Sequence, residues 1–116
     1  PDRMSLLMVE DRFAGRAAAR RALADGARRL VFVGRDDIAA SRLRCRGARD
    51  VAEKAGVGLD FGPCGMNYGA GRSAGLALCA AVSESDLPTA LIAANDWLAV
   101  GLRSGLTETA SALRAA

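Results

Sequence analysis

Histidine is missing from all 116 residues of the chain. That absence removes the usual general base, the commonest zinc ligand and every Ser-His or Cys-His nucleophile pair. The three cysteines, Cys45, Cys64 and Cys79, are an odd set, and no two have the C-x-x-C spacing of a metal or redox site. We therefore expect no enzyme, no bound metal and no cofactor, with the cysteines small, reduced and buried.

Long apolar runs are also missing. No stretch approaches the roughly 20 apolar residues that a membrane helix needs. The N-terminal run "SLLMVE" is short and is not followed by the small-residue cleavage site of a signal peptide. The expected compartment is the cytoplasm, with no membrane partner.

Lysine and aromatic residues are scarce. Lys54 is the single lysine, so arginines supply nearly all of the positive charge, and the net charge is +3. A pI near 9.2 invites a nucleic-acid interpretation. The arginines alternate with Asp and Glu, however, and few aromatic rings are present for stacking. Solvated helix faces are the favoured interpretation of this charge.

Apolar runs and helical patterns alternate along the whole chain. The expected strands cover 5–10, 28–34, 57–65 and 88–94. Helices are expected over 14–27, 69–85 and 96–114, and the stretch 36–56 is expected to be a loop followed by a helix. Continuous apolar strands between helices indicate an α/β fold, an open parallel sheet with helices on both faces. We expect 28–34 at the centre, flanked by 58–63 and 89–94, with 5–10 in a neighbouring subdomain or at the periphery.

Local signals place the helix ends. Gly26 and Gly56 are expected to end the first two helices. The second helix is expected to be capped by Ser41 or by an aspartate just before it. Asp96 is expected to cap the last helix, with Trp97 in the core.

Few motifs carry chemistry. The stretch "GAGRSAG" (69–75) matches neither nucleotide fingerprint, and a tight turn with close helix packing is its favoured interpretation. The carboxylate pairs at 10–11 and 36–37 are interpreted as caps and solvated loops. Arg42, Arg44 and Arg46 lie near a helix start. For Arg44, contact with a ligand and simple solvent exposure are equally good interpretations, whereas solvent exposure is favoured for Arg42 and Arg46. Asn95 ends a parallel strand, where a side-chain amide typically faces the ligand cleft.

The motifs, taken in order, give the chain a likeness to a known family. "VEDRFAG", "ALADGARRLVFVG", "SRLRCRGARDVAEKAG", "NYGAGRSAGLAL" and "PTALIAANDWLAVGL" together resemble the effector-binding domain of LacI-type transcription regulators. This domain has a periplasmic-binding-protein-like fold of type I. The last motif is the most specific, and the likeness covers nearly the whole chain. By this resemblance, residues 1–13 would be a crossover strand from the neighbouring subdomain, and 14–116 would be an incomplete C-terminal effector-binding subdomain.

The resemblance also implies ligand-binding residues. Arg44 matches the arginine that contacts the effector, and Asn95 matches the polar residue of the N-D turn. Met66 falls where an aromatic residue often stacks on the ligand, with Tyr68 beside it, and Glu10 falls where an aspartate commonly sits near the crossover.

The implied function is that of a sensor. A small, sugar-like effector would shift the arrangement of two subdomains and so change the operator affinity of a repressor. The implied partners are that effector, a second copy of the chain in a homodimer, and operator DNA through a headpiece not contained in these residues. The alternative is a solute-binding component of a sugar transport system with the same fold.

Overall fold

A three-stranded parallel sheet organises the molecule. The computed structural model describes residues 10–81 and 88–115. Strand β1 (Arg29–Gly34) lies between β2 (Gly58–Pro63) and β3 (Thr89–Ala93), and both neighbours run parallel to it. The predicted strand order, with 28–34 at the centre, is confirmed.

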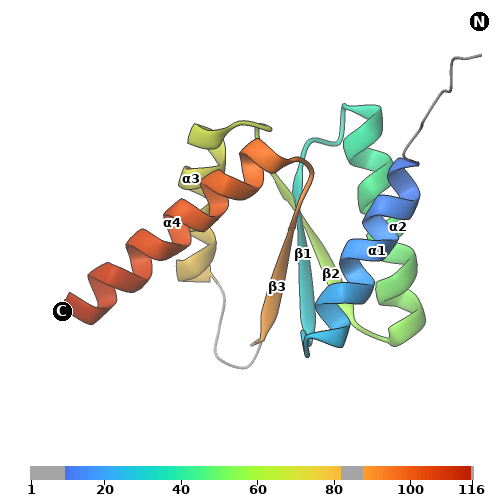
Figure 1. The fold of residues 1–116 in the computed structure, drawn as a ribbon, viewed down its shortest axis with the longest axis horizontal. Helices are drawn as coiled ribbons and strands as arrows, with labels where there is room; N and C mark the ends of the chain where they lie inside the picture. Colours follow the sequence, from blue (N-terminus) through green and yellow to red (C-terminus); the bar gives the residue numbers. More distant parts are fainter. Residues whose placement is uncertain (1–9, 82–87, 116) are drawn as a thin grey trace, which may run out of the picture.

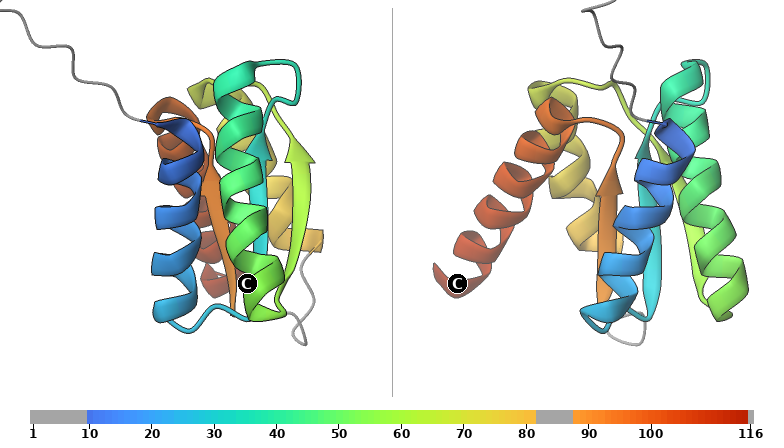
Figure 2. Two further views of the ribbon diagram at one scale, coloured as in Figure 1. Left: turned by 90° about the vertical axis from the view of Figure 1, so that its right-hand side faces the viewer. Right: turned by 45° about the vertical axis from the view of Figure 1, so that its right-hand side comes forward.

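Two helical layers enclose the sheet. Helices α1 (Asp11–Ala24) and α2 (Ala39–Ala55) cover one face, and α3 (Tyr68–Ala81) and α4 (Asp96–Ala115) cover the other (Figures 1 and 2). This confirms the predicted fold class. No helix in the described part of the chain has an apolar stretch long enough to cross a membrane.

The core centres on β1, because helices cover it from both sides. Leu30, Phe32 and Val33 are almost completely buried, and the Phe32 ring stacks on Phe61 of β2 with centroids 6.4 Å apart. A strand buried on both faces needs apolar side chains at consecutive positions. The run "RLVFVG" meets this requirement, which is why it was readable from sequence.

Glycine ends the first two helices, as predicted. Gly26 and Gly56 have φ angles of +98° and +69°, in the left-handed region that side chains with a Cβ rarely adopt. After α1, the N–H of Ala27 reaches back to the carbonyl of Ala22 at 3.0 Å, which closes the helix end.

Helix α1 begins earlier than predicted. It starts at Asp11 rather than at residue 14, with Glu10 as the capping residue but without a side-chain cap bond. Residues 5–9 of the expected strand (5–10) and residues 1–9 of the expected crossover (1–13) lie outside the described residues. Asp11, Arg12 and Phe13 form the first turn of α1, because Asp11 is held there by a partner on α2, described below.

The predicted cap of α2 was wrong. The helix begins after Ile38, and no side chain caps it. Ser41 lies inside the first turn, fully buried, where its Oγ accepts the backbone N–H of Arg35 at 3.1 Å. The Asp37 carboxylate accepts from the Arg35 guanidinium at 2.5 and 2.8 Å. Both candidate caps are thus used to hold the loop between β1 and α2.

Candidate functional site: the carboxyl edge of the sheet

Three loops meet where the parallel strands end. They are residues 35–38 after β1, 64–67 after β2 and 94–95 after β3. In open parallel sheets, ligands bind at this edge, because strand ends and helix starts converge there. The edge lies at the top of the sheet in Figure 1.

Arg44 ties three elements together at this edge. Its Nε donates to the Asp11 carboxylate at 3.0 Å, and its Nη1 donates to the backbone carbonyl of Ala94. The two side chains are about one-third exposed, at 33% for Arg44 and 27% for Asp11. A guanidinium has five N–H donors, so Arg44 keeps donors for a ligand oxygen after making these two bonds.

Asn95, rather than Asp96, caps α4, which corrects the prediction. The Asn95 Oδ1 accepts the backbone N–H of Leu98 at 2.9 Å, and its Nδ2 donates to the carbonyl of Met66 at 3.2 Å. A capping side chain reaches the N–H three residues ahead, and from this helix start that geometry belongs to Asn95. Asp96 is the exposed first residue of α4, where its negative charge complements the helix dipole.

Arg44 and Asn95 line the same cleft. Its volume is about 500 Å³, and it runs between the sheet-facing side of α1 and the strand β3. Both residues lie at the end of the cleft that adjoins the β3–α4 loop. The structure therefore brings together two of the five residues that the sequence nominated.

The other nominated residues are distributed differently. Met66 is half-buried against the core and meets Asn95 through its backbone carbonyl. Tyr68 begins α3, and its hydroxyl pairs with the Ser104 hydroxyl of α4 at 2.8 Å. Glu10 is 66% exposed and lies 3.8 Å from Arg16. Tyr68 and Glu10 therefore do not share the cleft of Arg44 and Asn95.

Sequence reasoning missed two residues that shape this edge. Asp11 anchors Arg44 from 33 positions away in the chain, and no local signal predicts such a pairing. Asn67 caps α3, because its Oδ1 accepts the N–H of Ala70 at 2.9 Å. Asparagine directly before a helix start is a recognised capping signal, so the cap at Asn67 could have been predicted from the sequence.

Trp97 was predicted in the core, and that prediction was wrong. Its side chain is 70% exposed, and Val100, one turn later, is 57% exposed. Leu98 and Leu102 turn inward from α4 and are buried. The helical period then leaves Trp97 and Val100 on the outer surface.

The cysteines at the edge do not have activated thiols. Burial raises the pKa of Cys64 and of Cys45 above the ordinary thiol value, and Arg49 partly opposes the shift at Cys45. Both cysteines are free and half-buried. Among the described residues, no three His, Cys, Asp or Glu side chains gather to form a metal site.

Several solved structures share this fold. A LacI family regulator from Mycobacterium smegmatis aligns with a TM-score of 0.79 at 23% identity, over 94% of this chain and 41% of the other. A LacI family regulator from Enterococcus faecium with bound ribose aligns with a TM-score of 0.74 at 21% identity, over 87% and 37%. A periplasmic ribose ABC transporter from Conexibacter woesei aligns with a TM-score of 0.74 at 20% identity, over 86% and 34%.

The chain thus spans well under half the length of these structures, and the likeness shows the fold. No curated protein sequence matches it. The family model of the periplasmic binding protein-like domain matches residues 19–111, which is most of the chain. The strand order, the helical layers and this match agree, and the chain belongs to the periplasmic binding protein-like domain family.

Proposed function

We propose that this chain is the effector-sensing part of a LacI-type transcriptional repressor and that it binds a small, sugar-like ligand in the cleft of Arg44 and Asn95. The observation that carries the proposal is that these two residues line one cleft, at the end of it that adjoins the carboxyl edge of a parallel sheet. Similar structures are described with bound ribose, with fructose 1-phosphate and with phosphate. All three ligands present oxygen atoms that accept hydrogen bonds.

The chemistry of Arg44 suits such a ligand. Its guanidinium carries a permanent charge in a planar fork that matches hydroxyl, carboxylate and phosphate oxygens. Asp11 holds it at 3.0 Å, which reduces the side-chain freedom that the ligand must remove. Hydrogen bonds to Met66 and Leu98 hold the Asn95 side chain in place. Its Oδ1 keeps a second lone pair that can accept a hydrogen bond from a ligand hydroxyl.

The mechanism is a shift between conformations. Arg44 connects α1, α2 and the end of β3, so a ligand that accepts its remaining N–H donors adds a further bond at the point where these elements meet. The preferred arrangement of these elements then differs between the bound and the free protein. In a DNA-binding headpiece outside these residues, this difference in arrangement would change the affinity for operator DNA.

The proposed assembly is a homodimer in the cytoplasm. Trp97 and Val100 expose apolar surface on α4, next to a hollow of about 400 Å³ lined in part by Tyr68 and Arg103. Helix α4 carries two acidic and two basic residues, so two copies can meet there without net repulsion. An exposed apolar face of low net charge is typical of a self-complementary interface.

A solute-binding component of a sugar transport system is the second candidate. The match to the Conexibacter woesei ribose transporter supports it. Both candidates require the same ligand cleft, and DNA binding separates them. A repressor changes its affinity for a DNA fragment from its own promoter when the sugar is added, whereas a transport component does not bind that fragment.

The direct test is a thermal-shift and calorimetry screen of the intact protein with ribose, fructose 1-phosphate and other monosaccharides. A ligand at 100 times its Kd stabilises the folded state by about 2.7 kcal/mol, which is readily measured. We expect at least one sugar to raise the melting temperature and to release heat on titration. If no sugar or sugar phosphate in the panel does so, the proposal fails.

A further inference from the structure

Positive charge is concentrated in one helical layer. Helices α1 and α2 carry nine Arg or Lys residues and three Asp or Glu residues, whereas α3 and α4 carry three Arg residues and two acidic ones. The +3 net charge of the chain is thus unevenly distributed, with a strongly basic face on α1 and α2 and a nearly neutral face on α3 and α4. A basic face of this kind attracts acidic partners and accelerates their encounter.

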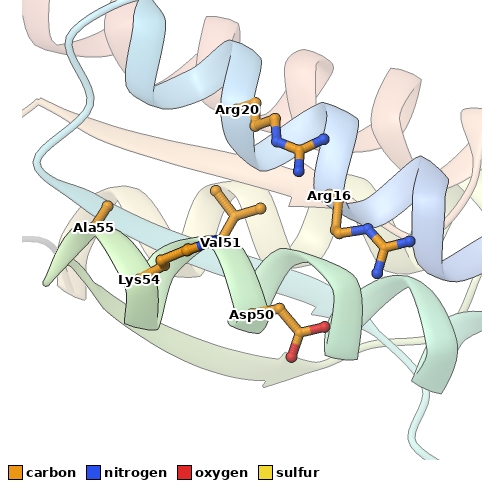
Figure 3. Close-up of a pocket in the computed structure, with 6 residues that line it drawn as sticks. All are labelled: Arg16, Arg20, Asp50, Val51, Lys54 and Ala55. Atoms are coloured by element: carbon orange, nitrogen blue, oxygen red, sulfur yellow. The ribbon is translucent and has the colours of Figure 1, made fainter.

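A groove between α1 and α2 runs through this basic face. It has a volume of about 360 Å³. Arg16 and Arg20 extend over it from α1, and Lys54 extends over it from α2 (Figure 3). Val51 and Ala55 form an apolar floor.

The carboxylate in the groove does not neutralise these cations. Asp50 is held by Arg12, whose Nε and Nη2 donate to its Oδ2 at 2.8 and 2.6 Å. Arg16 forms an ion pair with Glu10 at 3.8 Å. Within residues 10–81 and 88–115, no ion pair involves Arg20 or Lys54.

We propose that this groove binds an acidic segment of a partner protein, with carboxylates on Arg16, Arg20 and Lys54 and an apolar side chain on Val51. The apolar floor and the basic rim together favour this occupant. A nucleic acid would gain less binding free energy, because the groove has no aromatic ring on which bases stack. A lone phosphate would also gain less binding free energy, because it leaves the apolar floor exposed to water. This site is separate from the cleft of Arg44 and Asn95.

The test measures binding of a short, labelled synthetic peptide that repeats Glu-Glu-Leu to the intact protein, by fluorescence anisotropy at about 50 mM salt, where charge screening is weak. Arg20→Gln and Lys54→Gln should each weaken binding about threefold, the scale of one exposed ion pair. The matched control is Arg42→Gln, which removes the same charge from the opposite flank of α2, where Arg42 lines a different hollow. This control should leave the affinity unchanged.

Four outcomes overturn the proposal. The first is that the peptide does not bind. The second is that Arg42→Gln weakens binding as much as Arg20→Gln does, because binding then follows overall charge and not the groove. The third is that a DNA duplex competes better than the acidic peptide, which assigns the face to nucleic acid. The fourth is that inorganic phosphate displaces the peptide at an equal concentration of carboxylate, which assigns the groove to a small anion.

Discussion

The side-chain oxygen of Asn95 accepts the backbone N–H of Leu98 at 2.9 Å, so Asn95 closes the first turn of α4 while it also lines the cleft shared with Arg44. One residue therefore serves the helix and the wall of the candidate site. A substitution that removes the cap also alters the site, and the two effects can be separated by the choice of the replacing residue.

Two substitutions at Asn95 separate these roles. Asn95→Ala should lower the free energy of unfolding by about 1 kcal/mol, the usual value of a lost cap. Asn95→Asp keeps the capping oxygen but replaces the donor to Met66 with a second acceptor, so its loss should be smaller than that of Asn95→Ala. Urea denaturation of both variants measures the difference. Equal losses for Ala and Asp would show that the cap is not the stabilising contact.

Asp96 supplies the matched control. Because Asp96 is exposed and makes no cap bond in the described structure, Asp96→Asn should change stability by no more than the dipole effect of about 0.3–1 kcal/mol. Asparagine caps as well as aspartate, so the test of the cap itself is Asp96→Ala, and a larger loss for Asp96→Ala than for Asn95→Ala would show that Asp96 is the cap.

Helices α3 and α4 approach closely through glycines, which gives a packing prediction. A Cβ on Gly75 would lie 2.5 Å from the carbonyl oxygen of Leu102, so the helices must separate. Gly75→Ala should destabilise the protein by about 1–3 kcal/mol through overpacking. Gly69, on the same helix, has only a side-chain oxygen 3.7 Å from such a Cβ. Gly69→Ala should be neutral or stabilising, as alanine favours helices. Denaturant titration checks both, and a stabilising Gly75→Ala would contradict the packing.

The cysteine pKa shifts predict slow alkylation. Burial raises the pKa of Cys64 and Cys45, so each holds less thiolate at neutral pH than a free thiol. Their reaction with iodoacetamide should be slower than that of free cysteine at pH 7 and should rise as the pH passes their raised pKa values. Arg49→Gln should slow Cys45 further, because Arg49 favours its thiolate. Peptide-resolved mass spectrometry measures each site, and a rate above that of free cysteine would refute the shift.

The proposed dimer forms through the exposed apolar face of α4, and this can be tested by placing a charge on that face. Val100→Asp places a charge on the exposed apolar surface and should convert the proposed dimer into monomers in analytical ultracentrifugation. Phe13→Asp is the matched control, because Phe13 is 55% exposed on α1, in the other layer. If both variants sediment as the wild type does, the interface lies elsewhere.

The carboxyl edge and the central strand were predictable, whereas the identity of the cap was not. The run 30–33 is apolar at consecutive positions and consists of branched and aromatic residues, a pattern typical of a strand covered on both faces. Asn95 and Asp96 are both good capping residues, so a shift of one position in the helix start exchanges their roles. That start is set by tertiary contacts, since the Ala94 carbonyl bonds to Arg44, 50 residues away.

The exposure of Trp97 escaped prediction for a related reason. Its type favours burial, and only the inward turn of Leu98 and Leu102 shows that the indole lies on the far side of α4. The Asp11 partner of Arg44 was equally invisible, because it depends on the close contact of α1 with α2.

The most direct measurement is the calorimetric affinity of the Arg44→Gln variant for a sugar that the proposed screen finds to bind the intact protein. Removing the guanidinium should weaken binding about 10- to 100-fold, because hydrogen bonds from a charged donor contribute about 1.5–3 kcal/mol. Arg42→Gln, two positions away and exposed, should bind as the wild type does. Wild-type affinity in Arg44→Gln, with the sugar still bound and the protein folded, would contradict the assignment of the cleft.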